Sequence, residues 1–215
     1  MNRPRSHPLA SHASAGRQRV VVILAIAGLL LAAGCGSGDE VAAGNEPDSK
    51  YSGVVLGEPT NRPQFTLTDL DGNPFDFYEQ TDGKLTFLFF GYTNCPDVCP
   101  VHMAQLSEIL ARPGMPSAKV VFVTADPTRD TPRVMEKFLG NFDPEFIGLT
   151  GTEEEIRAAE KAAGIPPAQF DTEDGKPDPD GDYTVSHAGQ VLAFAPDNRG
   201  YTVYPFGTRT SQYSD

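Results

Sequence analysis

"LTFLFFGYTNCPDVCP" (residues 85–100) joins a strongly apolar segment to two of the chain's three cysteines. The first part, "LTFLFF", is a continuous apolar run of strand length, which is typical of a central strand buried on both faces. The second part carries Cys95 and Cys99, each followed by a proline. This pair has three possible interpretations: a redox couple, a metal site or a structural disulfide.

Pro100 indicates where the next helix begins, because a helix interior rejects proline whereas its first turn accepts it. We therefore expect Asp97 to cap the helix, with Cys99 in its first turn and Cys95 in the preceding loop. There, unpaired backbone N–H groups and the positive end of the helix dipole favour a thiolate. The thiolate is the form of cysteine that binds a metal or attacks a disulfide.

The spacing of the two cysteines leaves these alternatives open. Three residues separate them, whereas thioredoxin-type redox motifs have two. At positions i and i+4 of a helix the Cβ atoms lie about 5–6 Å apart, and a disulfide needs about 3.5–4.5 Å. The loop position of Cys95 makes a disulfide feasible, but so short a loop gains little entropy from it. A metal tolerates the wider geometry, and soft thiolates select Cu(I), or Zn(II) with four ligands.

The rest of the chain alternates predicted strands and helices. "QFTLTDLDGNPFDF" (64–77) predicts an N-terminal β-hairpin that turns at Asp71-Gly72. Further strands are expected within residues 119–126, 145–151 and, as a pair, 182–207, and helices within 101–111, 131–142 and 152–164. Thr131 is the expected N-cap of the second helix, and Thr152 with Glu155 forms a capping box on the third. This order predicts an α/β fold in which helices flank a mixed central sheet.

The N-terminus predicts export. Four arginines precede an apolar run over residues 20–33, which is too short for a membrane span of about 20 residues but suits a signal peptide. The run ends in "AAGC", which resembles the lipobox of bacterial lipoproteins. We expect residues 1–34 to be a lipoprotein signal peptide, Cys35 to be lipidated, 35–50 to be a flexible tether and 51–215 to be the folded domain. The alternative is an ordinary secretory signal that leaves Cys35 as a free thiol.

The charge of the exported part excludes nucleic acid as a partner. Without the four signal-peptide arginines, 13 basic residues face 29 acidic ones, a net charge of about −16. Such a surface repels phosphates. We expect lipid, rather than a basic patch, to hold the domain at the outer face of the bacterial cytoplasmic membrane. One acyl chain binds weakly, so stable anchoring implies the multiple acylation of bacterial lipoproteins.

Three stretches together are similar to the signatures of the Sco/SenC family, in the same order. They are "FFGYTNCPDVCP" (89–100), "VTADPTRDTP" (123–132) and "YTVSHAGQVLAF" (183–194). The resemblance covers about residues 51–210. It implies a thioredoxin-like fold and a site for copper, as Cu(I) or Cu(II), made by Cys95, Cys99 and His187.

The resemblance also implies a role in the assembly of cytochrome c oxidase. A membrane-tethered metallochaperone would take copper from a donor protein and deliver it to the binuclear copper centre of oxidase subunit II. The alternative is a thiol-disulfide reductase that uses Cys95 and Cys99 as a redox pair to keep the cysteines of that subunit reduced. Peroxidase chemistry is a weaker third option. We rank the chaperone first, because a reductase needs two sulfurs, whereas the third ligand, His187, is needed only for a metal.

Four further residues are singled out by position. Asp126 follows a buried strand at the edge where sites of open α/β sheets gather, so we expect it to orient the ligands or to assist sulfur chemistry. The alternative is a turn-forming aspartate. Arg129 and Asp130 are expected to pair locally. His102 follows Cys99 by three residues and is expected to lie on the helix surface, with an auxiliary ligand as the alternative.

Two segments near the C-terminus also carry expectations. The acidic run "DTEDGKPDPDGD" (171–182) is expected to be a solvated loop, because Tyr183 stands where a calcium loop needs glycine. The chain stops at "TRTSQYSD" (208–215), where one more helix would cover the sheet. We therefore expect that a C-terminal helix is missing.

Overall fold

A computed structural model describes residues 53–213 of the chain. The expected signal peptide, Cys35, the expected tether and the first two residues of the expected folded domain lie outside the described residues. The eight strands of the main sheet are, in order across it, β1 (Val54–Asn61), β10 (Arg199–Tyr204), β9 (Val191–Phe194), β4 (Leu85–Gly91), β5 (Ala118–Thr124), β6 (Ile147–Thr150), β2 (Thr66–Asp69) and β3 (Pro74–Asp76). A separate pair is formed by β7 (Gln169–Phe170) and β8 (Val185–Ser186). The helices are α1 (Phe77–Thr81), α2 (Val98–Leu110), α3 (Pro132–Leu139), α4 (Glu153–Ala162) and the 3₁₀ turn η1 (Thr210–Tyr213).

The sheet is mixed, as the order of the predicted elements indicates. β4 pairs in parallel with β5, and β5 pairs in parallel with β6. β9 pairs antiparallel with β4, and β2 pairs antiparallel with β3 and with β6. The predicted hairpin is therefore confirmed as β2–β3. β1, an edge strand that pairs with β10, is an element that the sequence pattern did not predict.

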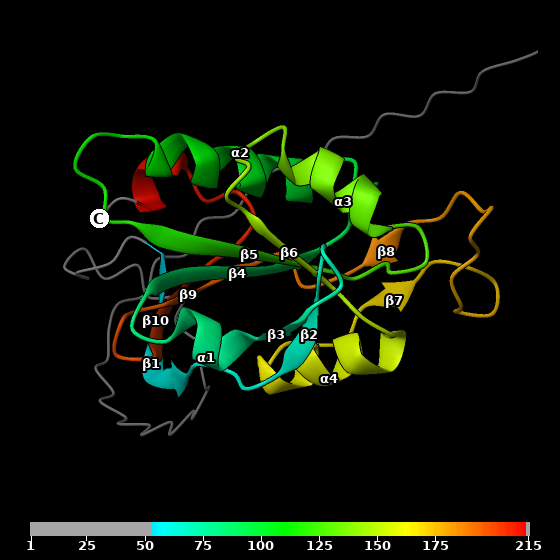
Figure 1. The fold of residues 1–215 in the computed structure, drawn as a ribbon, viewed down its shortest axis with the longest axis horizontal. Helices are drawn as coiled ribbons and strands as arrows, with labels where there is room; N and C mark the ends of the chain where they lie inside the picture. Colours follow the sequence, from blue (N-terminus) through cyan, green and yellow to red (C-terminus); the bar gives the residue numbers. More distant parts are fainter. Residues whose placement is uncertain (1–52, 214–215) are drawn as a thin grey trace, which may run out of the picture. The chain divides into compact units, whose positions relative to one another are not determined.

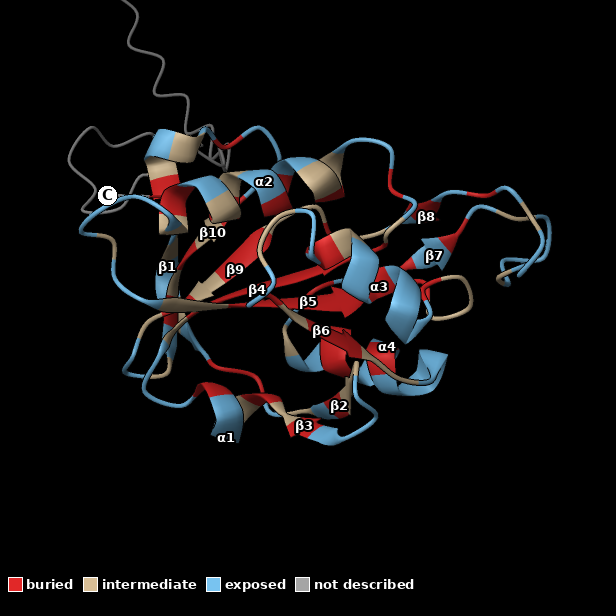
Figure 2. Cartoon of the chain, turned by 45° about the horizontal axis from the view of Figure 1, so that its top comes forward, coloured by how far each residue is buried: buried red, intermediate tan, exposed pale blue. Residues whose placement is uncertain are grey.

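Helices cover both faces of the sheet, with α2 and α3 on one side and α1 and α4 on the other (Figure 1). β4 lies between β9 and β5, and all but its first residue are buried (Figure 2). Its side chains alternate between two cores: Phe87 and Phe89 belong to the core under α2 and α3, whereas Leu88 and Phe90 belong to the core against α4. Each such side chain contributes roughly 1.5–3 kcal/mol on burial. The strand therefore contributes side chains to the cores on both faces of the sheet.

The predicted helix caps are confirmed. The Thr131 hydroxyl accepts a hydrogen bond from the Val134 backbone N–H at the start of α3. Thr152 and Glu155 form the reciprocal capping box of α4. Asp97 caps α2 and accepts a 2.6 Å hydrogen bond from the Val98 N–H. The start of the cysteine-bearing helix is therefore fixed by its own sequence.

Arg62, at the end of β1, is a buried cation that the sequence analysis did not single out. Its guanidinium donates hydrogen bonds to the hydroxyls of Thr81 and Thr86 and to the carbonyl oxygens of Lys84 and Ala195, at 2.7–3.0 Å. Burial lowers its pKa from the ordinary value. The side chain joins the end of β1 to α1, β4 and the turn after β9.

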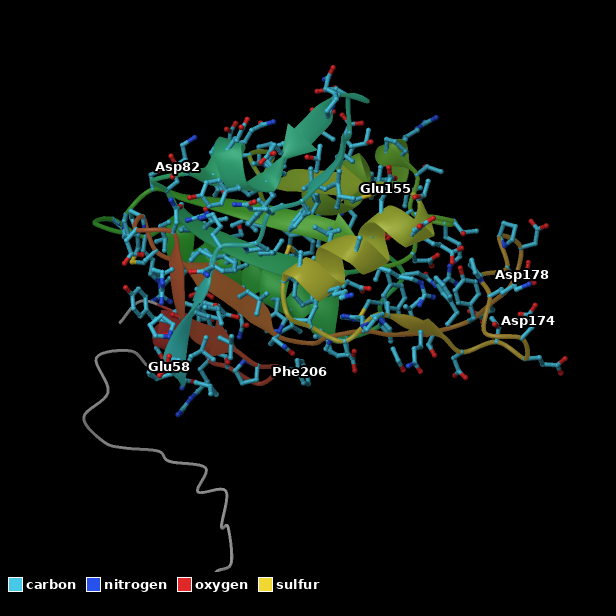
Figure 3. All side chains as sticks on the ribbon, turned by 90° about the horizontal axis from the view of Figure 1, so that it is seen from below. Glu58, Asp82, Glu155, Asp174, Asp178 and Phe206 are labelled. Atoms are coloured by element: carbon cyan, nitrogen blue, oxygen red, sulfur yellow. The ribbon has the colours of Figure 1, made fainter. Side chains whose placement is uncertain are left out.

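The acidic loop between β7 and β8 is largely exposed, as expected. Asp174 and Asp178 lie on this loop where it extends from the sheet (Figure 3). At the end of the described chain, η1 lies against α2, and Tyr213 stacks on Tyr204 with ring centroids 4.3 Å apart. Within residues 53–213, no helix is both long and apolar enough to cross a membrane.

Candidate metal centre

The two sulfurs lie where β4 passes into α2, as predicted. Cys99 is in the first turn of α2 and is fully buried, whereas Cys95 lies in the preceding loop with 8% of its surface exposed. Both are free thiols. The backbone N–H of Cys99 points at the Cys95 sulfur, with N and Sγ 3.4 Å apart. One of the unpaired N–H groups at the helix start therefore faces a sulfur, as the position of the pair indicates.

Folding brings His187 to the same place from late in the chain. It directly follows β8, and its Nε2 lies 3.5 Å from Cys99 Sγ and 4.0 Å from Cys95 Sγ. The ligand atoms of the three residues all lie within 4.8 Å of one another. Among the residues that the structure describes, these three form the one group of three or more His, Cys, Asp or Glu side chains with metal-site spacing.

The orientation of the His187 ring suits a ligand. Its Nδ1 lies 3.2 Å from the carbonyl oxygen of Ala188, to which an Nδ1–H donates. This bond leaves the Nε2 lone pair directed at the sulfurs. The rings of Phe89 and Tyr92 pack edge-on against the imidazole, with centroids 5.8 and 5.6 Å away. His187 itself is half-buried, so it lies at the mouth of the site.

The pKa values of the two thiols are shifted in opposite directions. A hydrogen bond from the Cys99 thiol, with a further one from the Cys99 backbone N–H, lowers the pKa of Cys95 to about 4. Burial raises the pKa of Cys99, and the neighbouring Cys95 sulfur raises it further. Cys95 is therefore the thiolate of the metal-free pair, and Cys99 keeps its proton.

Gly91, the last residue of β4, makes room for the buried sulfur. A Cβ at this position would lie 2.8 Å from Cys99 Sγ and 2.6 Å from the Phe89 ring. The motif "GYTNC" therefore needs glycine for close approach rather than for backbone freedom. The sequence pattern does not show this role, although the glycine stands between the apolar run and the cysteines.

Asp130 organises the loop that carries Cys95. Its carboxylate accepts hydrogen bonds from the backbone N–H and the hydroxyl of Thr93, at 2.9 and 2.5 Å, and from the hydroxyl of Thr124 at 2.7 Å. Burial raises its pKa. Sequence reasoning expected Asp130 only to pair with Arg129 and missed this role, because the local pattern does not show which acid of the motif reaches the loop.

Asp126 is fully buried after β5, but its carboxylate bonds to Arg129 at 2.6 Å and to the Tyr183 hydroxyl at 2.8 Å. The guanidinium of Arg129 also stacks over the Tyr183 ring, 3.5 Å from its centroid. The expected local pair of Arg129 with Asp130 is wrong, because Arg129 pairs with Asp126. These contacts fix the base of the acidic loop ahead of β8.

The prediction that His102 lies on the helix surface is also wrong. The side chain is fully buried. Its Nδ1 lies 2.9 Å from the Tyr213 hydroxyl, and its Nε2 lies 3.0 Å from the Gly189 carbonyl oxygen. The helical pattern placed Met103 and Leu106 inside, but it contained no sign that η1 and the loop after β8 would cover the neighbouring face of α2.

The sheet flanked by helices and the three converging ligand atoms define a thioredoxin-like protein with a candidate centre of two sulfurs and one imidazole. The model of the SCO1/SenC family matches residues 56–215, and the chain belongs to this family.

Three known proteins illustrate the similarity. SCO2 of Saccharomyces cerevisiae mitochondria is 34% identical over 169 residues, which are 76% of this chain and 52% of that protein. Yeast Sco1 with copper bound superposes with a TM-score of 0.60 at 29% identity, covering 75% of this chain and 85% of that one. Bradyrhizobium japonicum ScoI with copper bound gives a TM-score of 0.58 at 33% identity, covering 74% and 94%. The chain spans about half the length of the mitochondrial relative.

Proposed function

We propose that this protein is a copper-binding Sco metallochaperone whose ligands are Cys95, Cys99 and His187. The observation that carries the proposal is the convergence of two sulfurs and an imidazole nitrogen within 4.8 Å at the edge of the domain. Copper-bound structures of similar proteins support this choice of metal.

The donor set suits copper as cargo. Two soft sulfurs and one imidazole make a near-trigonal set that accommodates copper in either oxidation state. Cys99 lies in the interior, whereas Cys95 and His187 lie nearer solvent. A partner's ligands can therefore approach copper from the side of Cys95 and His187. We propose cytochrome c oxidase subunit II as the acceptor and a copper donor protein as the source.

The proposal is tested by titrating Cu(I) against the purified chain carrying Cys35→Ser, so that the third thiol binds no copper. We expect one equivalent, and an affinity loss of at least about tenfold in each of Cys95→Ser, Cys99→Ser and His187→Ala. Unchanged Cu(I) binding in both serine variants would show that the two cysteines do not form the copper site. Unchanged Cu(I) affinity in His187→Ala would favour the thiol-disulfide reductase described below.

The unequal acidity of the two thiols favours thiol-disulfide exchange as a second candidate function. The Cys95 thiolate would attack a disulfide of subunit II, and Cys99 would then resolve the mixed disulfide. The partner would leave as a dithiol with two electrons, and Cys95 and Cys99 would be left as a disulfide. In Cys99→Ser the mixed disulfide should persist and be detectable on a non-reducing gel. Its absence with a disulfide-bonded partner would exclude this function.

We also propose that lipid on Cys35 holds the domain at the outer face of the bacterial cytoplasmic membrane. The support is the signal-peptide pattern that ends at this cysteine and the acidic character of the rest of the chain. Expressed in a bacterium, the protein should fractionate with membranes, and Cys35→Ser should not. A mature N-terminus without acyl groups, measured by mass spectrometry, would contradict the proposal.

A further inference from the structure

His102 is a buried histidine that the proposed metal chemistry does not use. Both ring nitrogens already have partners, Tyr213 and Gly189, so neither is free to bind a metal. The Gly189 carbonyl can only accept, so Nε2 carries the proton and Nδ1 accepts from the Tyr213 hydroxyl. Burial lowers the pKa of His102, in keeping with a neutral ring that has one N–H and one lone pair.

The partner on Nε2 lies in the loop that carries His187. Residues 187–190 join β8, which has two residues, to β9 in the main sheet. Across the described chain, no backbone-to-backbone hydrogen bond outside the strand ladders involves these four residues. The bond from His102 to Gly189 therefore ties the loop backbone to α2, two residues beyond His187.

Helix α2 carries both the Cys99 sulfur and the His102 side chain that bonds to the His187 loop. Cys99 lies in the first turn of α2, and His102 lies three residues further along it. Between them and the sheet, the Phe89 ring packs against both imidazoles, with centroids 5.1 Å from that of His102 and 5.8 Å from that of His187. A side chain of α2 therefore contacts the loop that carries His187, and the same helix carries the Cys99 sulfur.

We propose that His102 is a positioning residue: its hydrogen bond to Gly189 fixes the loop so that His187 faces the two sulfurs. The inference rests on the proposed function, in which His187 is a copper ligand. Removing the donor leaves the Gly189 carbonyl without its partner. The loop then relaxes away from α2, and the third ligand becomes less well placed.

Two variants separate the hydrogen bond from packing. His102→Met fills the buried space without a donor. His102→Gln retains an N–H near the position of Nε2. Tyr213→Phe is the matched control, because it removes the hydrogen bond on the other ring nitrogen and keeps the aromatic ring. All are made in the chain carrying Cys35→Ser, and Cu(I) affinity is measured by competition with a chromophoric chelator.

We expect Cu(I) affinity to be about tenfold weaker in His102→Met. This value is the lower end of the roughly 10–100-fold loss in metal affinity that follows when a hydrogen-bond partner that supports a ligand is removed. His102→Gln should restore the affinity to within about threefold of the parent, and Tyr213→Phe should leave it unchanged. Parent-like affinity in His102→Met would overturn the inference. So would an equal loss in Tyr213→Phe, since the effect would then not be specific to the hydrogen bond between His102 and Gly189.

Amide hydrogen exchange in the metal-free protein gives a readout that does not depend on copper. His102→Met should speed exchange across residues 187–190, and His102→Gln should not. If the parent fails to bind Cu(I), the proposed function fails, but this comparison still decides whether His102 holds the loop. If His102→Met does not fold, His102→Asn replaces it, because its side chain stays near Tyr213 and is too short for Gly189.

Discussion

Cys99 Sγ and the Phe89 ring occupy the space that a side chain at residue 91 would need. Gly91 holds no ligand atom and yet limits where one of the proposed ligands can lie. The sequence shows the glycine but not the contact, because the sulfur comes from a helix eight residues later. A substitution here tests the fine geometry of the site without removing any donor.

Gly91→Ala should weaken Cu(I) binding by roughly tenfold, since the added methyl group forces the Cys99 sulfur or the Phe89 ring to move. Competition with a chromophoric Cu(I) chelator measures the change. Gly57→Ala is the matched control, because a Cβ at that position meets no atom within 4 Å. Equal affinities in the two variants would show that the close approach at Gly91 has no bearing on the site.

The reactivity of Cys95 should depend little on pH. Its pKa is lowered to about 4, chiefly by the hydrogen bond from Cys99, so it is a thiolate throughout the neutral range. An ordinary thiol with a pKa near 8.5 alkylates tens-fold more slowly at pH 6 than at pH 8. For Cys95 in the metal-free protein we expect less than a threefold change in the rate of reaction with iodoacetamide. A slope of one decade per pH unit would show that the thiol is not activated.

The elements differ in how far the sequence predicted them. The apolar run of β4 and the caps of α2, α3 and α4 are local signals, and each was confirmed. The triplet of Cys95, Cys99 and His187 came from a family resemblance, and the structure brings their ligand atoms together. β1 and the two-residue β7 were missed, and residues 182–207 contain three strands rather than the expected pair, because such pairing depends on distant partners rather than on local residues.

Buried polar side chains were the least predictable feature. The sequence around Arg62 and His102 gives no sign that these polar residues are buried. Each is covered by segments far away in the chain. The partners of Arg62 include Ala195, and those of His102 are Gly189 and Tyr213. Only the assembled fold shows which acceptors their N–H groups reach.

Arg62→Met should lower the free energy of unfolding by about 3 kcal/mol or more, because it leaves several buried acceptors without a donor. Urea denaturation of the metal-free protein measures the loss. Cu(I) affinity should stay at the parent value, because Arg62 and its partners are not among the residues of the candidate site. A copper defect without a stability defect would show that this cluster acts on the site rather than on the fold.

For the molecule as a whole, His102 couples stability to pH. Burial lowers its pKa below the ordinary value of 6.5. As the pH falls through 6.5, the His102 imidazole becomes protonated in the unfolded chain, whereas burial opposes its protonation in the folded chain. The unfolded state then binds more protons, so the free energy of unfolding falls. Between pH 7 and pH 5.5 the metal-free protein should therefore lose stability through this group.

His102→Gln removes this group, so the variant should lose less stability than the parent between those two pH values. Urea denaturation of the metal-free proteins at pH 7 and 5.5 gives the difference. Asp130 and Glu160, whose pKa values burial raises, act in the opposite direction at lower pH and are common to both proteins. Identical losses in parent and variant would show that His102 titrates in the folded state as it does in the unfolded chain.

X-ray absorption at the copper edge tests whether two sulfurs and one imidazole bind the metal, on the chain carrying Cys35→Ser loaded with one equivalent of Cu(I). We expect copper coordinated by two sulfurs and one nitrogen. In His187→Ala the imidazole nitrogen should be lost from the spectrum while both sulfurs remain. A parent spectrum with sulfur ligands alone, or an imidazole that persists in His187→Ala, would show that His187 is not the third ligand.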